Sequence, residues 1–339
     1  MLDSLIELGF FSAKAVIIVA LILILVAGLV TILSRGKEKM GGKISIKNLN
    51  KYYDDIKQSL LEQILTKKDF KKYLKTSKAD TKLQANTPPR NNLFIIDFNG
   101  DMKASAVASL REEVTAILNI AKPQDKVLVK IESGGGMVHA YGLASAQLAR
   151  FREKNIPLIV SVDKVAASGG YMMAAVANKI ISAPFAIIGS IGVIVQLPNF
   201  NRVLKDKHID FEQITAGNFK RTLTLFGENT DEAREKLHQE IEEIHGLFKN
   251  LIHEYRKDVD IERVSTGEHW VGKQALPLKL VDEIMTSDDY LLSHSKNFNL
   301  YEIKFHIKKS FAEKLFGAQS RLTENLFNKS NLFTFGSKI

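Results

Sequence analysis

The sequence contains no cysteine among its 339 residues. This absence excludes a disulfide framework, a cysteine nucleophile and a thiolate metal site, but it leaves the redox compartment open. The H-E-x-x-H motif, any cluster of histidines with carboxylates, and the G-x-x-x-x-G-K-[ST] phosphate loop are absent as well. We therefore expect no metal or other cofactor. No motif recurs in tandem, which indicates one catalytic unit rather than a duplicated one.

The positive charge is concentrated in one segment of the chain. The formal net charge is +9, and residues 35–90 hold 15 Lys and Arg against 6 Asp and Glu, so the remainder is close to neutral. A uniformly basic protein would suggest nucleic acid, whereas one basic segment beside an apolar stretch indicates a membrane surface. We expect membrane lipid, and no nucleic acid, among the partners.

The apolar stretch Ala15–Ser34 contains 20 uncharged residues. As a helix it would extend roughly 30 Å, which matches the hydrocarbon core of a bilayer. It predicts a single-pass anchor over residues 1–34 in the inner membrane. A cleaved signal peptide is the alternative, although Asp3 and Glu7 precede the run and the run is long for one. The lysines that follow it favour a cytoplasmic location for the rest of the chain.

The remainder of the chain divides into three parts. Residues 35–90 predict a basic stalk, either a solvated charged face or a contact for lipid headgroups. Residues 91–290 alternate strands with helices, which predicts an α/β fold with a largely parallel core. Within them Ile180–Leu197 is uncharged, but Pro184 and two glycines interrupt it, so buried strands are expected rather than a second span. Residues 291–339 predict an amphipathic tail that could dock on a neighbouring chain or on lipid.

The elements expected in this central part are as follows. The strands are Leu93–Phe98, Val127–Glu132, Pro157–Val162, Lys179–Ser182, Ile187–Val195 and Phe211–Thr215. The helices are Lys103–Lys122, a helix from the first glycine-rich turn to about Lys154, Ala166–Asn178 and Thr230–Asp258.

Two glycine-rich turns follow predicted strands, Ser133-Gly134-Gly135-Gly136 and Ser168-Gly169-Gly170. A serine there lies at a helix N-terminus beside backbone N–H groups, which suits a nucleophile whose reaction creates an oxyanion. The alternative is an ordinary N-cap. No histidine lies in a small-residue turn, and His139, just past the first turn, is the most suitable general base among the eight. A lysine could serve instead if a desolvated site kept its amine neutral.

Longer stretches resemble a known family. They are ESGGGMVHAYGLA, DKVAASGGYMMAAVANKI, SAPFAIIGSIGV, PNFNRVL, TAGNFKRTLTLFGENT and GEHWVGKQAL, and together they cover about Leu93 to Ile284. In these stretches the chain is similar to the signal peptide peptidase A family of serine peptidases.

The resemblance implies a Clp-protease/crotonase fold and a Ser/Lys dyad. Ser168 would be the nucleophile, Lys220 the general base, and Ser190 the hydroxyl that holds the lysine. The oxyanion donors would be the N–H groups of Gly169 and Gly135. The family usually has Ser-Pro-Gly-Gly in the first turn, but here Gly134 stands in place of the proline, and slower or less rigid chemistry is expected. Near the domain end the family's Gly-Leu-Val-Asp becomes Lys279-Leu280-Val281-Asp282, which is expected to affect a helix cap only.

The substrate class is also implied by the resemblance, since family members cleave hydrophobic peptides such as spent signal peptides and assemble into homo-oligomeric rings. Met172, Met173, Phe185 and Ile187 would either line such a site or belong to the core. Family members place the catalytic domain outside the cytoplasm, contrary to the charge pattern, so the side remains open. Two alternatives are a non-catalytic membrane scaffold of the same fold and a crotonase-type acyl-CoA enzyme.

Overall fold

The computed structural model describes residues 10–11, 14, 16–19, 21–22, 42–84, 90–217 and 219–307. The chain divides into two units, residues 44–305 and residues 1–43 with 306–339. The tail residues 308–339 and most of the predicted anchor lie outside the described residues. Among the residues that are described, no helix combines the length and hydropathy needed to cross a bilayer.

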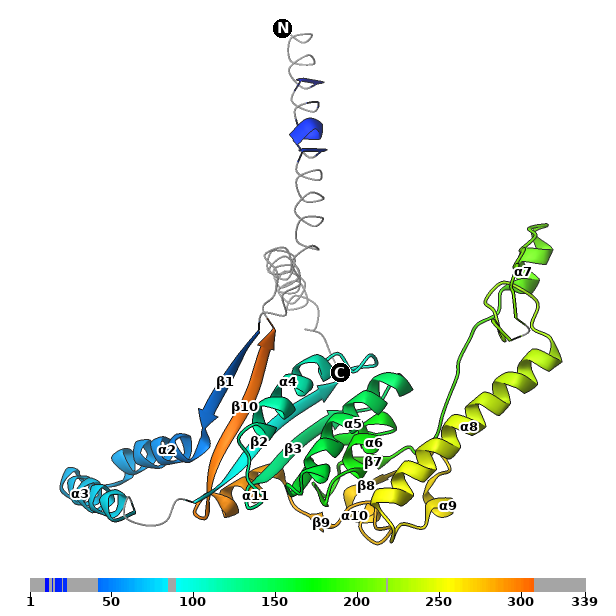
Figure 1. Ribbon diagram of the computed structural model, residues 1–339. Helices are drawn as coiled ribbons and strands as arrows, with labels where there is room; N and C mark the ends of the chain where they lie inside the picture. The colour runs from blue at the N-terminus through cyan, green and yellow to red at the C-terminus, as the bar shows by residue number, and fades with distance from the viewer. Residues whose placement is uncertain are drawn as a thin grey trace, which may run out of the picture. The chain divides into compact units, whose positions relative to one another are not determined.

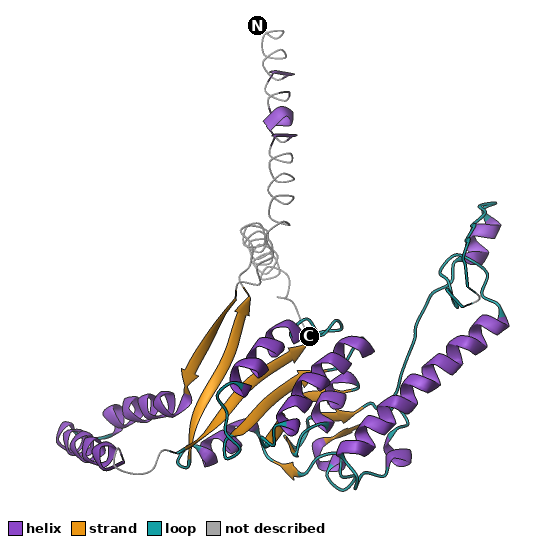
Figure 2. Ribbon diagram, in the orientation of Figure 1, coloured by secondary structure: helices purple, strands orange, loops and turns teal. Residues whose placement is uncertain are grey.

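The elements alternate along the chain as expected for an α/β protein (Figures 1 and 2). The strands are β1 (Gly42–Asn48), β2 (Asn91–Gly100), β3 (Lys126–Ser133), β4 (Leu158–Val162), β5 (Val165–Ala167), β6 (Lys179–Ser182), β7 (Ile187–Gly189), β8 (His269–Val271), β9 (Glu283–Ile284) and β10 (Phe298–Ile307). The helices are α2 (Leu49–Ile64), α3 (Lys67–Gln84), α4 (Val107–Leu118), α5 (Val138–Glu153), α6 (Gly169–Ala175), α7 (Asn201–Asp206), α8 (Asp231–Tyr255), α9 (Ile261–Val264), α10 (Gly272–Ala275) and α11 (Ser287–His294).

All described strands belong to one sheet, with the order β1-β10-β2-β3-β4-β6-β9. Strand β5 branches from this path by pairing with β3 and β7, and β7 pairs with β8. Every pairing among β2 to β7, and those of β10 with β2 and β9 with β6, is parallel, whereas β7 and β8 are antiparallel. The expected α/β fold with a largely parallel core is confirmed.

Strand β2 is buried on both faces because its side chains alternate between two hydrophobic clusters. Phe94, Ile96 and Phe98 belong to the larger cluster, which includes residues of α4, α5, α6 and α8. Leu93 and Ile95 belong to a smaller cluster with residues of α2 and α11. The apolar run 93–96 in the sequence therefore reflects burial on both faces of the sheet.

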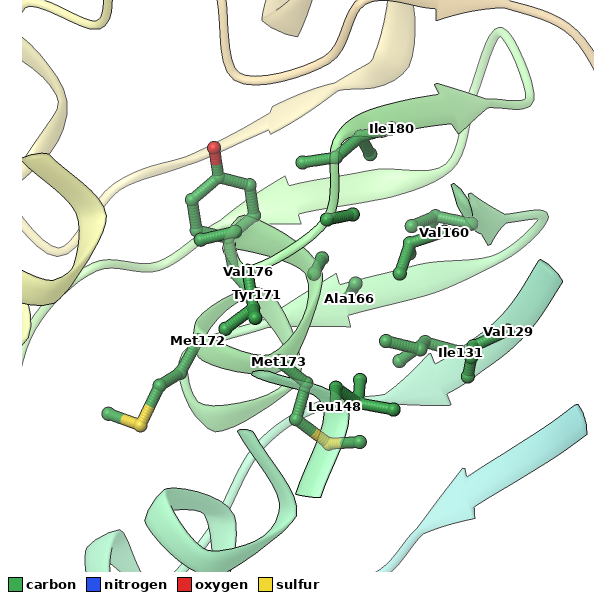
Figure 3. Close-up of a cluster of buried hydrophobic side chains, with 14 of the residues drawn as sticks. Val129, Ile131, Leu148, Val160, Ala166, Tyr171, Met172, Met173, Val176 and Ile180 are labelled. Atoms are coloured by element: carbon green, nitrogen blue, oxygen red, sulfur yellow. The ribbon is translucent and has the colours of Figure 1, made fainter. Parts of the chain in front are cut away.

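Helix α6 lies inside the larger cluster, and all seven of its residues are buried. In Figure 3 its side chains pack among those of β3, β4 and α5. Met172 and Met173, expected to line a site or to join the core, are 7% and 0% exposed and belong to the core, while Met172 also lines the cavity beside Ser168. Phe185 is 77% exposed and Ile187 is 39% exposed.

The sheet extends beyond the boundaries expected from the sequence. Residues 298–302 of β10, within the expected tail, pair with β2. Asn50, within the expected stalk, donates hydrogen bonds to the Ser295 and Phe298 carbonyls and accepts one from the Leu300 N–H. These contacts join segments about 250 residues apart, a distance over which no local pattern in the sequence carries information.

The expected strand Phe211–Thr215 is absent, and residues 209–217 form neither helix nor strand. The reason is that this segment leaves the core, since no described residue between 192 and 247 is buried. A short apolar run predicts a strand only where a sheet edge is available to pair with it.

Lys279 stands where the resemblance expects a glycine, and its φ is +62°. Its carbonyl accepts a hydrogen bond of 2.7 Å from Arg256, whose guanidinium also pairs with Asp282. The hydrogen bonds of Arg256 to Lys279 and Asp282 constrain this backbone. They keep Lys279, which has a Cβ, in a left-handed conformation that costs about 1 kcal/mol. The substitution thus alters local backbone strain.

We expect Lys279→Gly to raise the free energy of unfolding by about 0.5–1 kcal/mol, because glycine adopts this conformation without a steric cost. Urea denaturation of the variant and the wild type measures this difference. A variant less stable than the wild type would contradict the strain at this position.

Glu113 is a buried carboxyl group that connects α4 to β10. It is 4% exposed, and it accepts a hydrogen bond of 2.7 Å from the Phe305 N–H. Burial raises its pKa from 4.5 to about 7, although the Phe305 N–H and Lys304 oppose the shift. The folded protein therefore binds a proton here over a pH range in which the unfolded chain has released it.

Because the folded-state pKa is raised, the stability contributed by the protonated group is complete below pH 4.5 and is lost as the pH rises to about 7. We expect the free energy of unfolding to fall by about 1–3 kcal/mol across this window. Glu113→Gln keeps an acceptor for Phe305 and should remove this part of the pH dependence. Urea denaturation measures the free energy of unfolding of both proteins as a function of pH. An equal pH dependence in the wild type and the variant would contradict this role of Glu113.

Candidate active site

Ser168 lies between the end of β5 and the first residue of α6. Its φ of +51° and ψ of −120° are unusual for a residue with a side chain. The Ser168 N–H donates to the Gly189 carbonyl at 2.7 Å, and its own carbonyl accepts from the Met172 N–H at 2.9 Å. The backbone is thus held on both sides. The hydroxyl makes no capping hydrogen bond to α6. Ser168 therefore lacks the side-chain hydrogen bond that defines an ordinary N-cap.

The turn after β3 lies directly against Ser168. Gly135 has a φ of +89°, and a methyl group built on it would lie 2.7 Å from the Ser168 Cβ and 2.8 Å from the Gly169 nitrogen. The register explains this proximity, since Ser133 at the end of β3 pairs with Ala166 in β5. Only glycine permits so close an approach with a positive φ.

Two N–H groups of these turns were expected to bind an oxyanion. The Gly169 N–H is at the start of α6, where a helix leaves its amides without an intrahelical acceptor. The Gly135 N–H donates to the Ser133 Oγ at 3.1 Å. To bind an oxyanion, the Gly135 amide would have to share or give up this hydrogen bond.

A small cavity of about 80 Å³ opens beside Ser168. Its lining includes Ser168 and three glycines, and the remaining residues are apolar. The lining residues are Gly136, Val138, Ser168, Gly169, Met172, Gly192, Val193, Ile194, Ile244 and Phe248. Ile244 and Phe248, which come from α8, were not expected at this site. Their apolar spacing on a mainly polar helix was the available signal.

Ser190 lies next to Ser168 because β5 and β7 pair in parallel with Ala167 opposite Gly189. Ser168 and Ser190 therefore follow paired residues of neighbouring strands. Ser190 also has a positive φ, of +50°, and its N–H donates to the Glu268 carbonyl at 2.6 Å. The structure thus brings Ser168, Gly169, Gly135 and Ser190 together at the ends of three strands.

Lys220 is not part of this cluster. Its side chain is exposed and lines a second cavity, of about 670 Å³, which shares no lining residue with the cavity at Ser168. The neighbouring Phe219 ring lies 5.5 Å from the Lys236 Nζ, near the start of α8. Ile244, which lines the Ser168 cavity, is eight residues further along α8, or about 12 Å. Figure 1 shows the α7 segment at the end of α8 remote from α6.

The structure corrects the expected surroundings of Lys220 and leaves its role as general base a prediction. Lys220 was expected at the end of a core strand with apolar strands nearby, but that strand is absent and the side chain is exposed. His139 is on α5 with an exposed side chain.

Comparison with known proteins gives a consistent result. The protein-family model described as Peptidase family S49 N-terminal matches residues 3–148, and the family model described as Peptidase family S49 matches residues 150–300. The "Probable protease SohB" of Haemophilus influenzae is 44% identical over 331 residues, which cover 94% of this chain and 93% of the relative. The protein of that name from Buchnera aphidicola subsp. Schlechtendalia chinensis is 47% identical over 305 residues, 86% of this chain and all of the relative.

Among solved structures, the chain is similar to the 1510-N membrane-bound stomatin-specific protease. The two are 14% identical with a TM-score of 0.42, and the match covers 61% of this chain and 85% of that one.

The close approach of the two glycine turns makes a direct prediction. Gly135→Ala should lower peptide cleavage by about 100-fold or more, because the new methyl group would displace Ser168 or the Gly169 amide. Gly134→Ala is the matched control, since a methyl group there meets nothing within 4 Å. Cleavage rates at equal concentrations of folded protein, verified by circular dichroism, test the pair. Equal rates in the two variants would contradict the geometry.

Proposed function

The chain belongs to peptidase family S49, and from this premise we propose that it is a serine endopeptidase with Ser168 as its nucleophile. One observation carries the proposal. Ser168 is held in a left-handed backbone conformation at the start of a buried helix, with its hydroxyl free of capping and a glycine turn against it. Strained residues of this kind cluster at functional sites. We further propose that the fold is of the Clp-protease/crotonase type.

In the proposed reaction, the neutral amine of Lys220 takes the proton of the Ser168 hydroxyl while Oγ forms a bond to the peptide carbonyl carbon. The carbonyl oxygen becomes an oxyanion that accepts hydrogen bonds from the Gly169 and Gly135 amides. The C–N bond then breaks, and Lys220 gives its proton to the leaving amine. Water, deprotonated by Lys220, attacks the acyl-enzyme, and the proton returns to Ser168. Ser190 holds the lysine amine.

We propose that Lys220 reaches Ser168 from a second copy of the chain. Within one chain the two residues line separate cavities, and Lys220 is exposed, whereas a lysine base requires a desolvated site. Lys220 lies in the segment 192–247, called the arm below. The arm has exposed apolar side chains, including Ile194 at 76%, Ile214 at 95% and Phe219 at 50% exposure. Packing between copies would cover these side chains and the lysine together. Their exposure in the single chain therefore supports the expected homo-oligomer.

The proposed substrates are apolar peptides, such as remnants of signal peptides. The apolar lining of the cavity at Ser168, which includes Val138, Val193 and Phe248, supports this class. The 20 uncharged residues Ala15–Ser34 support a single-pass anchor in the inner membrane, close to such substrates.

The dyad is tested by complementation. Ser168→Ala and Lys220→Ala should each lose cleavage of an apolar, signal-peptide-like substrate by about 1000-fold or more, because neither nucleophile nor base is replaced. When the two variants are unfolded together and refolded as a mixture, random assembly should restore about one site in four. Mass spectrometry of the products measures the cleavage, and circular dichroism verifies folding.

The other outcomes are equally specific. Normal cleavage by folded Lys220→Ala would refute the dyad, and inactive mixtures would refute its completion between chains. A folded wild type that cleaves none of several apolar peptides would favour the scaffold alternative. Binding of coenzyme A would favour an acyl-CoA enzyme.

A further inference from the structure

Tyr141 on α5 has a hydroxyl group for which the proposed reaction has no role. The residue is fully buried, and its hydroxyl donates to the Asp101 carbonyl at 2.8 Å. The same oxygen lies 2.5 Å from the Ser133 Oγ. Because the tyrosine proton is given to Asp101, the Ser133 hydroxyl donates to Tyr141. The Ser133 Oγ in turn accepts the Gly135 N–H, so three hydrogen bonds run in sequence from Gly135 to Asp101.

The ring of Tyr141 contacts the second turn. A Cβ built on Gly169 would run into the ring, lying 2.8 Å from both the Tyr141 Cβ and Cδ2. The Gly169 backbone therefore lies directly against the base of the Tyr141 ring. One side chain thus holds the Gly135 turn through its hydroxyl and supports the Gly169 turn through its ring.

The centre of the network is buried. Ser133 is 2% exposed and Tyr141 is 0% exposed, so water does not compete for the hydrogen bond between them, whereas the hydrogen bonds of Gly135 and Asp101 at the two ends are partly buried. Gly100 completes the enclosure, because a Cβ there would meet the Tyr141 hydroxyl and would lie 2.5 Å from the Ser133 Oγ. Burial also raises the pKa of Tyr141, although the hydrogen bond from Ser133 opposes the shift, and the hydroxyl stays protonated at neutral pH.

We propose that Tyr141 is a positioning residue that sets the distance between the two oxyanion-binding amides, acting on Gly135 through Ser133 and on Gly169 by contact. The proposal rests on the proposed function of Ser168. Oxyanion stabilisation depends on donors placed within a few tenths of an ångström. A long hydrogen bond of 3.1 Å to Ser133 orients the Gly135 amide and leaves it able to be shared with the oxyanion in a three-centre arrangement.

Tyr141→Phe keeps the ring and removes the hydroxyl. We expect kcat to fall about 10- to 100-fold with KM changed less than about twofold, because only transition-state binding is lost. Affinity for a peptide aldehyde, which forms a tetrahedral adduct with serine, should weaken by the same factor. Ser133→Ala should have the same effects, and the double variant should be no worse than either single one, because the two residues act in one chain of hydrogen bonds.

Tyr171→Phe is the matched control. Tyr171 is also fully buried, and its hydroxyl donates to the Leu280 carbonyl at 3.0 Å, away from both glycine turns. It should lose comparable stability but keep kcat, KM and aldehyde affinity within about twofold. This comparison separates a specific effect on the reaction from general loosening of a buried network.

The outcomes are distinct. Three results would each overturn the positioning role: an unchanged kcat in Tyr141→Phe, an equal loss of kcat in Tyr171→Phe, or additive losses in the double variant. If the wild type still depends on Ser168, the proposed function would stay intact in each of these cases. Cleavage that persists in Ser168→Ala would overturn the proposed function and this inference with it. If Tyr141→Phe fails to fold, Ser133→Ala alone decides through the kcat and aldehyde measurements.

Discussion

The parallel pairing of β3, β5 and β7 is the constraint on which the candidate site depends. Ser133 pairs with Ala166, and Ala167 pairs with Gly189, so the three strands end at one level. Parallel strands deliver their carboxyl ends to the same edge of a sheet. The loops that leave this edge therefore meet, and Ser168 is held there by its hydrogen bond to the Gly189 carbonyl.

This edge also stores strain. Ser168, Ser190 and Gly135 all have positive φ values, and a residue with a side chain pays about 1–3 kcal/mol for such a conformation. The surroundings offset the cost, since α6 is buried along its whole length and the strand pairings on either side are regular. A rigid core thus maintains a backbone geometry that an isolated segment would abandon.

The arm between residues 192 and 247 has the opposite character, because none of its described residues is buried. Segments with few buried contacts lie at the low end of local stability. It also carries exposed apolar side chains, including Ile214 and Phe219. The proposed association between chains would account for both this exposure and the position of Lys220. In the proposed dyad, Ser168 is therefore held in place by the core of its own chain, whereas Lys220 would be held by contacts with a second chain.

Local patterns in the sequence were sufficient for much of the central sheet and its covering helices, because apolar runs and helical periodicity report burial directly. They also identified the two glycine turns, since glycine is needed where backbones approach closely. The position of Lys220, the role of β10 in the sheet and the contact of Tyr141 with both turns were decided only by the tertiary structure. Each depends on residues far apart in the chain, whose proximity follows from strand register and packing and leaves no periodic signal in the sequence.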